Sequence, residues 1–475
     1  MRSGHRTLVA AALLALMAGG CTLAPDYRRP DAPVPDRLPH TGAASSEEAK
    51  AAGKQAVIDA SLGWRDFFAD PQLQRLIQQA LDNNRDLRAS ILTVEQYQAL
   101  YRIQRSELFP EIHGTGSGLK QRTMVGEDVY GTTEAYAASV GITAYELDLF
   151  GRVRSLKEEA LERYLAMEET CRSARISLVA QVAGAYLSWL TDRELLAVTE
   201  DTLRVEQELH GLIEQRVQEG LTNEIVLAQA RTSLETARAN LVRYQRLVAQ
   251  DINNLILLIG GPLPHAAAQT ALSDQLKLSA APADLSSAIL LQRPDIMAAE
   301  HALKGANARI GAARAAFFPS IRLTAAAGKM SSDLSSLFDS GTGTWLFSPS
   351  INLPIFTGGR LSAELDVAEV SRDLHVALYE KAIQSAFREA ADALTANETY
   401  DRQLVAQQAN LEANQRYYAL ARERYNEGLD SFLPVLDAQR SLYAARQGYL
   451  NVRLGQLMSR INLYKALGGG WKERT

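Results

Sequence analysis

The second half of this chain repeats the first half at a nearly constant spacing. Phe109-Pro110 recurs as Phe318-Pro319, and Glu219-Gly220-Leu221 recurs as Glu427-Gly428-Leu429, at offsets of 209 and 208 residues. The repeats of solenoid proteins are far shorter, at roughly 50 residues or fewer. The sequence therefore indicates a tandem duplication of one large unit, with small insertions in its loops.

Each copy contains a very long stretch without proline, from 152 to 219 and from 361 to 433. A helix of about 68 residues would extend on the order of 100 Å, because each residue adds about 1.5 Å. Apolar residues three and four positions apart in the first stretch predict a helix that packs along its length, namely Ile176, Val179, Ala183, Tyr186, Leu187 and Leu190. We predict long helices at 152–219 and 222–259 in the first copy, and at 358–428 and 430–467 in the second.

A β-hairpin is expected before the long helices of each copy. From Tyr136 to Ala144 and from Trp345 to Leu353, apolar residues alternate with small or polar ones, which is typical of strands with one apolar face. Each strand is about ten residues long, the length at which a tilted strand crosses a membrane. We predict hairpins at 111–147 and 320–354, with polar outer loops at 122–133 and 330–344.

These elements divide the chain into two repeats, residues 61–268 and residues 269–470, followed by a short tail at 471–475. Each repeat should begin with a pair of shorter helices. Asp70-Pro71 in the first repeat and Pro294-Asp295 in the second are both typical of a helix start.

Four membrane-length strands per chain cannot close a barrel by themselves, since known single-chain barrels begin at about 8 strands. An open sheet in lipid would leave edge groups unpaired, each at a cost of several kcal/mol. The strands must therefore be shared between chains. Two chains would give a filled eight-stranded barrel, and three would give twelve strands around an open lumen, so we predict a homotrimer whose long helices continue the lumen as a second tube.

The first twenty residues have the layout of a signal peptide. Arg2 and Arg6 precede an apolar run from Leu8 to Met17, and small residues follow directly before Cys21. This arrangement is similar to a bacterial lipobox, so we expect the Cys21 thiol to carry a lipid after cleavage behind residue 20. Thr22 stands where an inner-membrane retention signal would have Asp, which favours the outer membrane. The alternative is an ordinary secretory signal with an incidental cysteine.

Residues 21–60 contain five prolines and are predicted to form an extended tether with little secondary structure. The formal net charge of −5 argues against nucleic-acid binding, which requires a basic surface. The histidines are scattered, with no metal-binding spacing. Cys171 has no partner nearby in the sequence, so we expect a free, packed thiol. We predict no catalytic residues, no metal site and no cofactor apart from the lipid on Cys21.

Several longer segments together resemble one known family. They are CTLAPDYRRP (21–30), ELDLFGR (146–152), LQRPDI (291–296), LPIFTGGR (353–360) and RYNEGLDSFLPVLDAQRSLYAAR (424–446). The chain resembles the outer membrane factors, the TolC-type efflux channels, and within them the lipoprotein branch that serves resistance-nodulation-division pumps. The resemblance covers nearly all of the mature chain.

This resemblance implies a trimer with a twelve-stranded outer membrane barrel and a helical tunnel in the periplasm. It implies a passive exit duct, not an enzyme, that receives drugs or toxic small molecules from an inner-membrane pump through a periplasmic adaptor. Two alternatives remain at this stage. One is an exit duct for type I protein secretion, and the other is a non-conducting trimeric coiled-coil lipoprotein.

The resemblance also implies a constriction at the periplasmic end of the channel, near the start of the last long helix. It places Leu433 and Asp437 at this gate, with Arg440 as a candidate partner of the acid. Three copies of Asp437 would form a cation-selective ring. Pro434 occupies the position where many relatives carry a second acid. The alternative for Asp437 is an acid that complements the dipole of the helix start.

The two turns between the long helices correspond to the turns with which the family contacts its adaptor. The residues are Gly220 and Leu221 in the first copy, and Gly428 and Leu429 in the second. A plain structural role for the glycines is compatible with this. Glu206, in the middle of a long helix, is expected to be exposed and far from any site.

Overall fold

The structure is a computed structural model that describes residues 22–38, 63–126, 129–264 and 286–469. The described residues belong to two compact units, and each is treated by itself below. The strand unit falls within residues 1–31, 93–168 and 298–380, and the helical unit within residues 32–92, 169–297 and 381–475. Cys21, the signal peptide and the tail at 471–475 lie outside the described residues.

The predicted helices are confirmed. They are α3 (Trp64–Phe67), α4 (Pro71–Asn83), α5 (Arg85–Ser106), α6 (Arg152–Gln218), α7 (Glu224–Ile259), α8 (Pro294–Ala315), α9 (Arg360–Asn426) and α10 (Leu433–Ala466), with short 3₁₀ turns η2 (Ser287–Gln292) and η3 (Leu334–Ser336). Each of the four long helices begins and ends within about three residues of its predicted bounds. Among the described residues, none of the helices combines the length and the apolar character needed to cross a membrane.

The ends of the shorter helices follow from local chemistry. The Asp70 carboxylate accepts a hydrogen bond from the backbone N–H of Gln72, which caps α4 directly before the proline at its first position. Asn223 caps α7 in the same way, and α7 ends at Gly260 with a positive φ of 66°. A residue with a Cβ would be strained there, which explains a glycine at this helix end.

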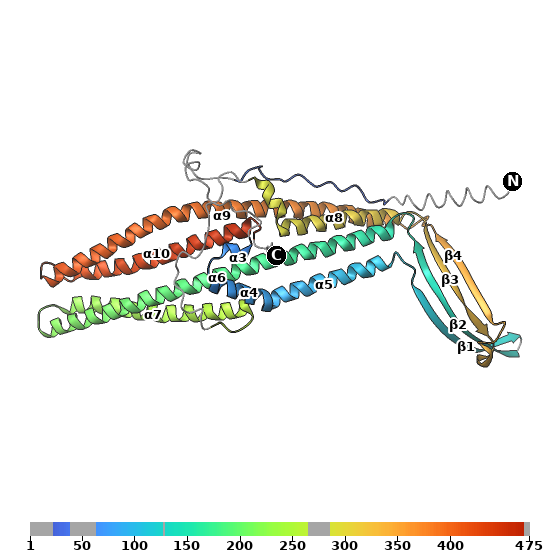
Figure 1. Ribbon diagram of the computed structural model, residues 1–475, viewed down its shortest axis with the longest axis horizontal. Helices are drawn as coiled ribbons and strands as arrows, with labels where there is room; N and C mark the ends of the chain where they lie inside the picture. Colours follow the sequence, from blue (N-terminus) through green and yellow to red (C-terminus); the bar gives the residue numbers. More distant parts are fainter. Residues whose placement is uncertain (1–21, 39–62, 127–128, 265–285, 470–475) are drawn as a thin grey trace. The chain divides into compact units, whose positions relative to one another are not determined.

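The strand unit contains a single antiparallel sheet in the order β1-β2-β3-β4. Its strands are β1 (Ile112–Gly126), β2 (Val129–Leu147), β3 (Ser320–Ser331) and β4 (Gly343–Asn352). Helix α5 leads into β1 at one edge, and α9 follows β4 at the other edge (Figure 1). The two predicted hairpins are therefore confirmed, and they lie side by side in one sheet.

The strand register gives this sheet one apolar face. Val140 of β2 lies opposite Ala327 of β3, and Ala327 lies opposite Trp345 of β4. The neighbouring positions on the other face include Ser139 and Gly328. The alternation predicted from the sequence is thus carried across adjacent strands, as a sheet with lipid on one side requires.

Two details of the sheet differ from the sequence prediction. The loop expected at 122–133 is far shorter, because β1 and β2 stay paired up to Gly126 and Val129. Within this extension Arg122 lies opposite Thr132, and its guanidinium lies 5.2 Å from the centre of the Tyr130 ring, so polar residues form strand here and not loop. The alternation in β2 also breaks at Ala144, where the register shifts and φ is 52°.

The N-terminal segment from residue 22 to 31 has no regular secondary structure, as predicted, but it is fixed to α8. Arg29 forms a bidentate ion pair with the buried carboxylate of Glu300, at 2.6 and 3.1 Å. Tyr27 donates a hydrogen bond to the same carboxylate, and the Asn307 amide donates to the Pro25 carbonyl at 2.7 Å. The first part of the predicted tether is therefore bound, while residues 39–60 lie outside the described residues.

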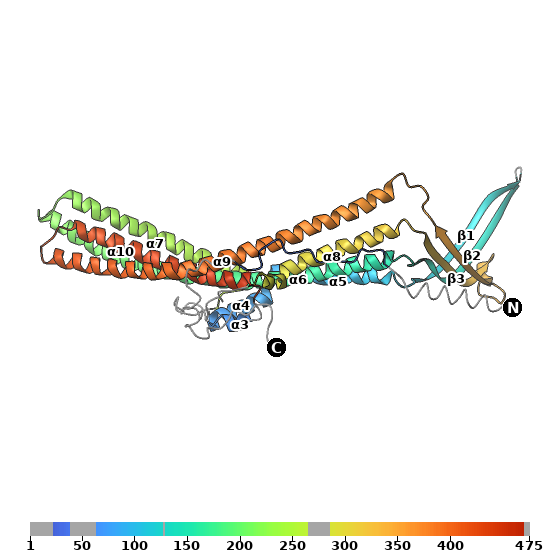
Figure 2. The ribbon, with the colours of Figure 1, turned by 90° about the horizontal axis from the view of Figure 1, so that it is seen from above.

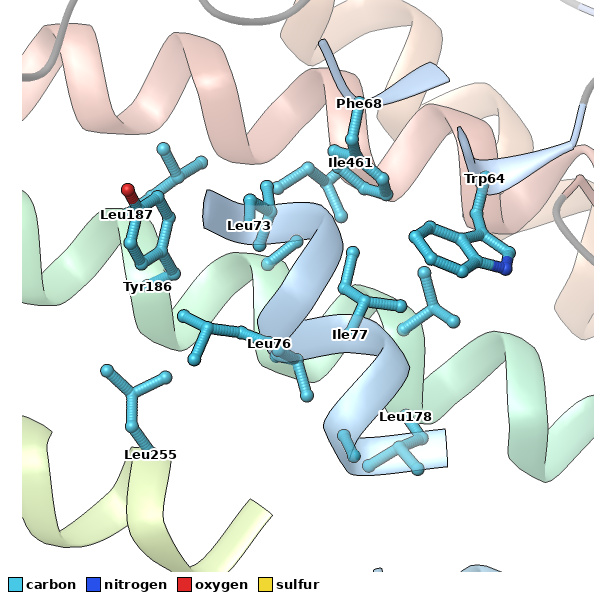
Figure 3. Packing of buried hydrophobic residues seen from close by; sticks show 14 of the residues in the cluster. Trp64, Phe68, Leu73, Leu76, Ile77, Leu178, Tyr186, Leu187, Leu255 and Ile461 are labelled. Carbon is cyan, nitrogen blue, oxygen red and sulfur yellow. The ribbon is translucent and has the colours of Figure 1, made fainter. Parts of the chain in front are cut away.

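The hydrophobic core of the helical unit brings together residues from α3, α4, the start of α5, α6, α7 and α10. Leu73, Leu76 and Ile77 of α4 point into it between the long helices (Figure 3). The six apolar positions predicted to pack in α6 are all buried. Within this core the Tyr186 hydroxyl donates a 2.7 Å hydrogen bond to Asp70, so the residue that caps α4 also connects α4 to α6. Cys171 has a free thiol and packs against the same core, as predicted.

The LQRPDI motif acts as more than a helix start. Arg293 donates hydrogen bonds to the Ala466 carbonyl at the end of α10 and to the Glu389 carboxylate on α9. It also forms a bidentate pair with Asp295 in the first turn of α8. One buried guanidinium thus connects the start of α8 to the two long helices of its repeat.

Candidate docking turns and constriction residues

The two turns between long helices have the same geometry. Gly220 has a φ of 72° and Gly428 a φ of 70°. In each turn the residue after the glycine donates a backbone hydrogen bond to the arginine carbonyl five residues earlier, from Leu221 at 2.8 Å and from Leu429 at 2.9 Å. This is a Schellman-type helix end, which needs a left-handed residue and so explains both glycines.

A buried cluster holds the two turns together. The Arg216 guanidinium donates a hydrogen bond to the Tyr425 hydroxyl and lies 4.8 Å from the centre of its ring. The buried residues of the cluster are Ile213, Ala230, Ala421, Tyr425, Phe432, Val435, Leu436 and Ala438. Leu221 and Leu429 remain exposed on top of it. The turns thus form a packed end of the helical unit on which Leu221 and Leu429 are exposed.

Leu433 and Asp437 lie one turn apart on a face of α10 that the other described residues leave exposed. Leu433 is 58% exposed, while Val435 on the opposite face and Leu436 beside it are buried. Asp437 accepts a 3.3 Å hydrogen bond from the Tyr417 hydroxyl of α9. The first turn of α10 contains no acid, so the alternative role of Asp437 as a helix-start residue has little support.

Arg440 does not pair with Asp437 within the described chain. Its guanidinium donates two hydrogen bonds to the Ser233 hydroxyl of α7, at 2.9 and 3.0 Å. This contact connects the last helix of the second repeat to the last helix of the first. Ser233 has no local sequence signal for this role, since it lies 207 residues away from its partner.

Glu206 is buried, and the expectation that it is an exposed position was wrong. Its side chain is 3% exposed, and its Oε2 atom has no hydrogen-bond partner among the described residues. Burial raises the pKa of this carboxyl to about 7, and the positive charge of Arg440 offsets only part of that effect. The spacing of Glu206, Leu209 and Ile213 would have placed it on the buried face, because positions 3 and 7 apart share one side of a helix.

The sequence of this chain matches a known protein family. The sequence profile described as outer membrane efflux protein matches the chain twice, over residues 76–261 and 285–469. The chain belongs to the outer membrane efflux protein family. The two matches also confirm the internal duplication, one for each predicted repeat.

Individual relatives of this efflux protein cover almost its whole length. It is 50% identical over 475 residues to the probable efflux pump outer membrane protein TtgC of Pseudomonas putida, covering 99% of this chain and 97% of the relative. It is 43% identical to the cation efflux system protein CusC of Escherichia coli O157:H7, covering 97% and 98%.

Solved structures agree with the fold of the protomer. The open state of the MtrE outer membrane channel of Neisseria gonorrhoeae superposes with a TM-score of 0.86 at 40% identity, over 95% of this chain and 99% of that one. The CusC structure gives a TM-score of 0.84 at 43% identity, over 95% and 100%. The efflux protein is thus an outer membrane channel component with paired hairpins and long helices, as the sequence predicted.

Proposed function

We propose that three copies of this efflux protein form a passive exit duct through the outer membrane. The main support for this proposal is the open four-stranded sheet, which has one apolar face. Among the described residues, no strand pairs with the outer edge of β1 or of β4. Such edges need partners in lipid. Three chains supply twelve strands, which leave a water-filled lumen, whereas two would supply a filled barrel.

The same proposal places the constriction at Leu433 and Asp437. Both side chains are exposed on α10 and directed away from the buried cluster below the turns. In a trimer, a ring of leucines would resist wetting, and a ring of carboxylates would favour cations. Arg440 then contributes by holding α10 against α7 through Ser233.

A periplasmic adaptor is proposed to dock on the paired turns, with Leu221 and Leu429 as apolar contacts, and to connect the duct to an inner-membrane pump. Relatives at 50% identity include a protein named toluene efflux pump outer membrane protein TtgC. This supports toxic organic molecules as the cargo. Selection is expected in the pump, since a wide lumen offers few specific contacts.

The mature N-terminus is proposed to be a lipidated Cys21 in the outer membrane, in keeping with the signal-peptide layout before it. Mass spectrometry of the purified N-terminal peptide should show a cleaved, acylated cysteine. An unmodified Cys21, or cleavage at another position, would contradict the anchor without affecting the channel.

Planar-bilayer recording of the purified trimer tests the duct and its gate together. Wild-type protein should conduct poorly, and the combined change Leu433→Ala and Asp437→Ala should raise single-channel conductance several-fold and remove cation preference. The matched control is Glu208→Ala, an exposed acid on α6. Equal conductance and selectivity in the double variant and wild type would place the gate elsewhere, and a trimer that never conducts would support the non-conducting lipoprotein.

A further inference from the structure

A buried carboxyl group lies in the helical unit, close to the helix that carries the proposed constriction. Glu206 of α6 is 3% exposed, and its Oε2 atom has no hydrogen-bond partner among the described residues. Buried polar atoms in folded proteins are almost always paired, because an unpaired one lowers stability. The unpaired oxygen of Glu206 therefore marks a place where the packed conformation is held at a cost.

Glu206 lies on the side of α6 that packs against the second repeat. One and two turns further along α6, Leu209 and Ile213 join the buried cluster below the turns, which also contains Val435 and Ala438 of α10. Within the helical unit, α6, α7, α9 and α10 run side by side toward these turns (Figures 1 and 2). The carboxyl is thus enclosed where helices pack, and a movement of α10 away from α6 would open it to water.

Arg440 connects this carboxyl to the constriction. Burial raises the pKa of Glu206 to about 7, and the positive charge of Arg440 on α10 opposes that rise only in part. The Arg440 guanidinium donates its hydrogen bonds to the uncharged Ser233 of α7 instead. Because Arg440 lies three residues after Asp437 on the same helix, a change in its surroundings acts directly on the proposed gate.

Helix α9 contributes a neutral neighbour. The Tyr418 hydroxyl lies within electrostatic range of Glu206, and burial raises its pKa above the ordinary value, so it stays uncharged near neutral pH. Arg422 of α9 and Arg446 of α10 are charged neighbours of that hydroxyl, and Arg446 already pairs with Asp201 of α6 at 3.3 Å. Among these groups, Glu206 is the one whose charge changes between about pH 5 and 8.

The two charge states of Glu206 favour different positions of α10. The neutral acid fits the packed helices, whereas the ionised form buries a charge that no donor satisfies. Separation of α10 from α6 would let water reach the carboxylate and return its pKa toward the ordinary value of about 4.5. Since the pKa is higher in the packed state, that state is favoured at low pH, and its advantage falls as the pH rises from about 4.5 to about 7.

We propose that Glu206 couples one proton per chain to the constriction: the bound proton holds α10 in place, and its loss to water releases α10 together with Leu433 and Asp437. The proposal rests on the proposed constriction and adds how it is regulated. The ratio of open to closed channels should rise up to about tenfold for each pH unit if one chain moves, and up to about a thousandfold if all three move together. Below about pH 4.5 and above about pH 7 the ratio should be constant.

Planar-bilayer recordings of the full-length trimer from about pH 4 to 8.5 test this coupling. The open probability of wild type should rise at least about tenfold between about pH 5 and 7 and then level off, whereas Glu206→Gln should keep one value across this range. Glu208→Gln is the matched control, since Glu208 is exposed on the same helix, and it should follow wild type. A flat wild-type profile, or a rise of the same size in Glu206→Gln, overturns the coupling.

Further variants separate this coupling from other sources of pH dependence. Asp437→Asn removes the titration of the carboxylate ring and should keep the rise; a rise that is lost there and kept in Glu206→Gln assigns the effect to the ring and overturns the coupling. Glu206→Met removes the ionisation without burying an amide, and it takes the place of Glu206→Gln, with the same two outcomes, if that variant does not assemble.

The combined change Leu433→Ala and Asp437→Ala distinguishes failure of the coupling from failure of the duct. If this double variant conducts and the wild-type profile is flat, the coupling is overturned and the duct stands. If neither protein conducts at any pH, the proposed duct is overturned as well.

Discussion

Glu206 should make the stability of the protein depend on pH. The buried carboxyl has its pKa raised from 4.5 to about 7, chiefly because burial disfavours the charged form. A carboxyl whose pKa is higher in the folded state costs nothing below the unfolded pKa and destabilises the fold as pH rises through the folded pKa. A difference of about 2.5 pKa units at about 1.4 kcal/mol each corresponds to about 3.5 kcal/mol for each chain above pH 7.

The change Glu206→Gln removes this ionisation and keeps the size of the side chain. The buried amide has a cost of its own, but that cost is the same at every pH. The free energy of unfolding of the variant, relative to wild type, should therefore rise by about 1.4 kcal/mol for each pH unit between roughly pH 5 and 7, and then level off.

Denaturant unfolding in detergent, followed by tryptophan fluorescence from pH 5 to 8.5 at one protein concentration, measures this difference. Glu208→Gln on the same helix is the matched control, since Glu208 is exposed. Its difference from wild type should be flat. A Glu206→Gln profile parallel to that of wild type would refute the reasoning, because it would mean that the carboxyl is not desolvated in the assembled protein.

Three further changes test the packing of the helical unit. Tyr186→Phe should lower the free energy of unfolding by about 1–3 kcal/mol in urea, because buried Asp70 loses its hydroxyl partner, and an unchanged value would mean that water replaces it. Gly260→Ala should cost at least about 1–2 kcal/mol in the same assay, since φ is 66° and a Cβ would lie 2.5 Å from the Asn83 carbonyl oxygen; a neutral effect would show that this turn relaxes. Arg293→Met should lower the melting temperature by several degrees in circular dichroism, and a melting temperature equal to wild type would contradict its role as a connection between three helices.

Much of the fold was predictable because its signals are long. Proline-free stretches and three-four spacing locate the helices to within a few residues, and two-residue alternation locates the hairpins. The end of the first hairpin was not predictable in this way. Arg122 and Thr132 are polar and were predicted to lie in a loop, yet they pair across two strands, and such cross-strand pairs leave no signal in the local composition.

Among the site residues, those with a local sequence signal were also easier to predict than those that depend on distant contacts. Gly220 and Gly428 were predictable as turn residues, because a left-handed helix end is common before a tight turn and favours glycine. The contact of Arg440 with Ser233 was not, since it joins two helices from different repeats. The charge of Glu206 suggested a position on the protein surface, whereas its spacing from the buried residues of α6 indicated a buried position. The side chain is buried, so the helical spacing was the better predictor.

The twin turns have a consequence for symmetry. Gly220 and Gly428 give the two turns of one chain nearly the same backbone, although Leu221 is followed by Thr222 and Leu429 by Asp430. Three chains in a ring would then present six tips, alternating between two kinds, so that the rim is close to sixfold in shape and threefold in sequence. A docking protein with six copies could bind all six tips, with one affinity for the Gly220 turns and another for the Gly428 turns. A docking protein with three copies would bind only one kind of turn, and it could recognise that kind only by its side chains.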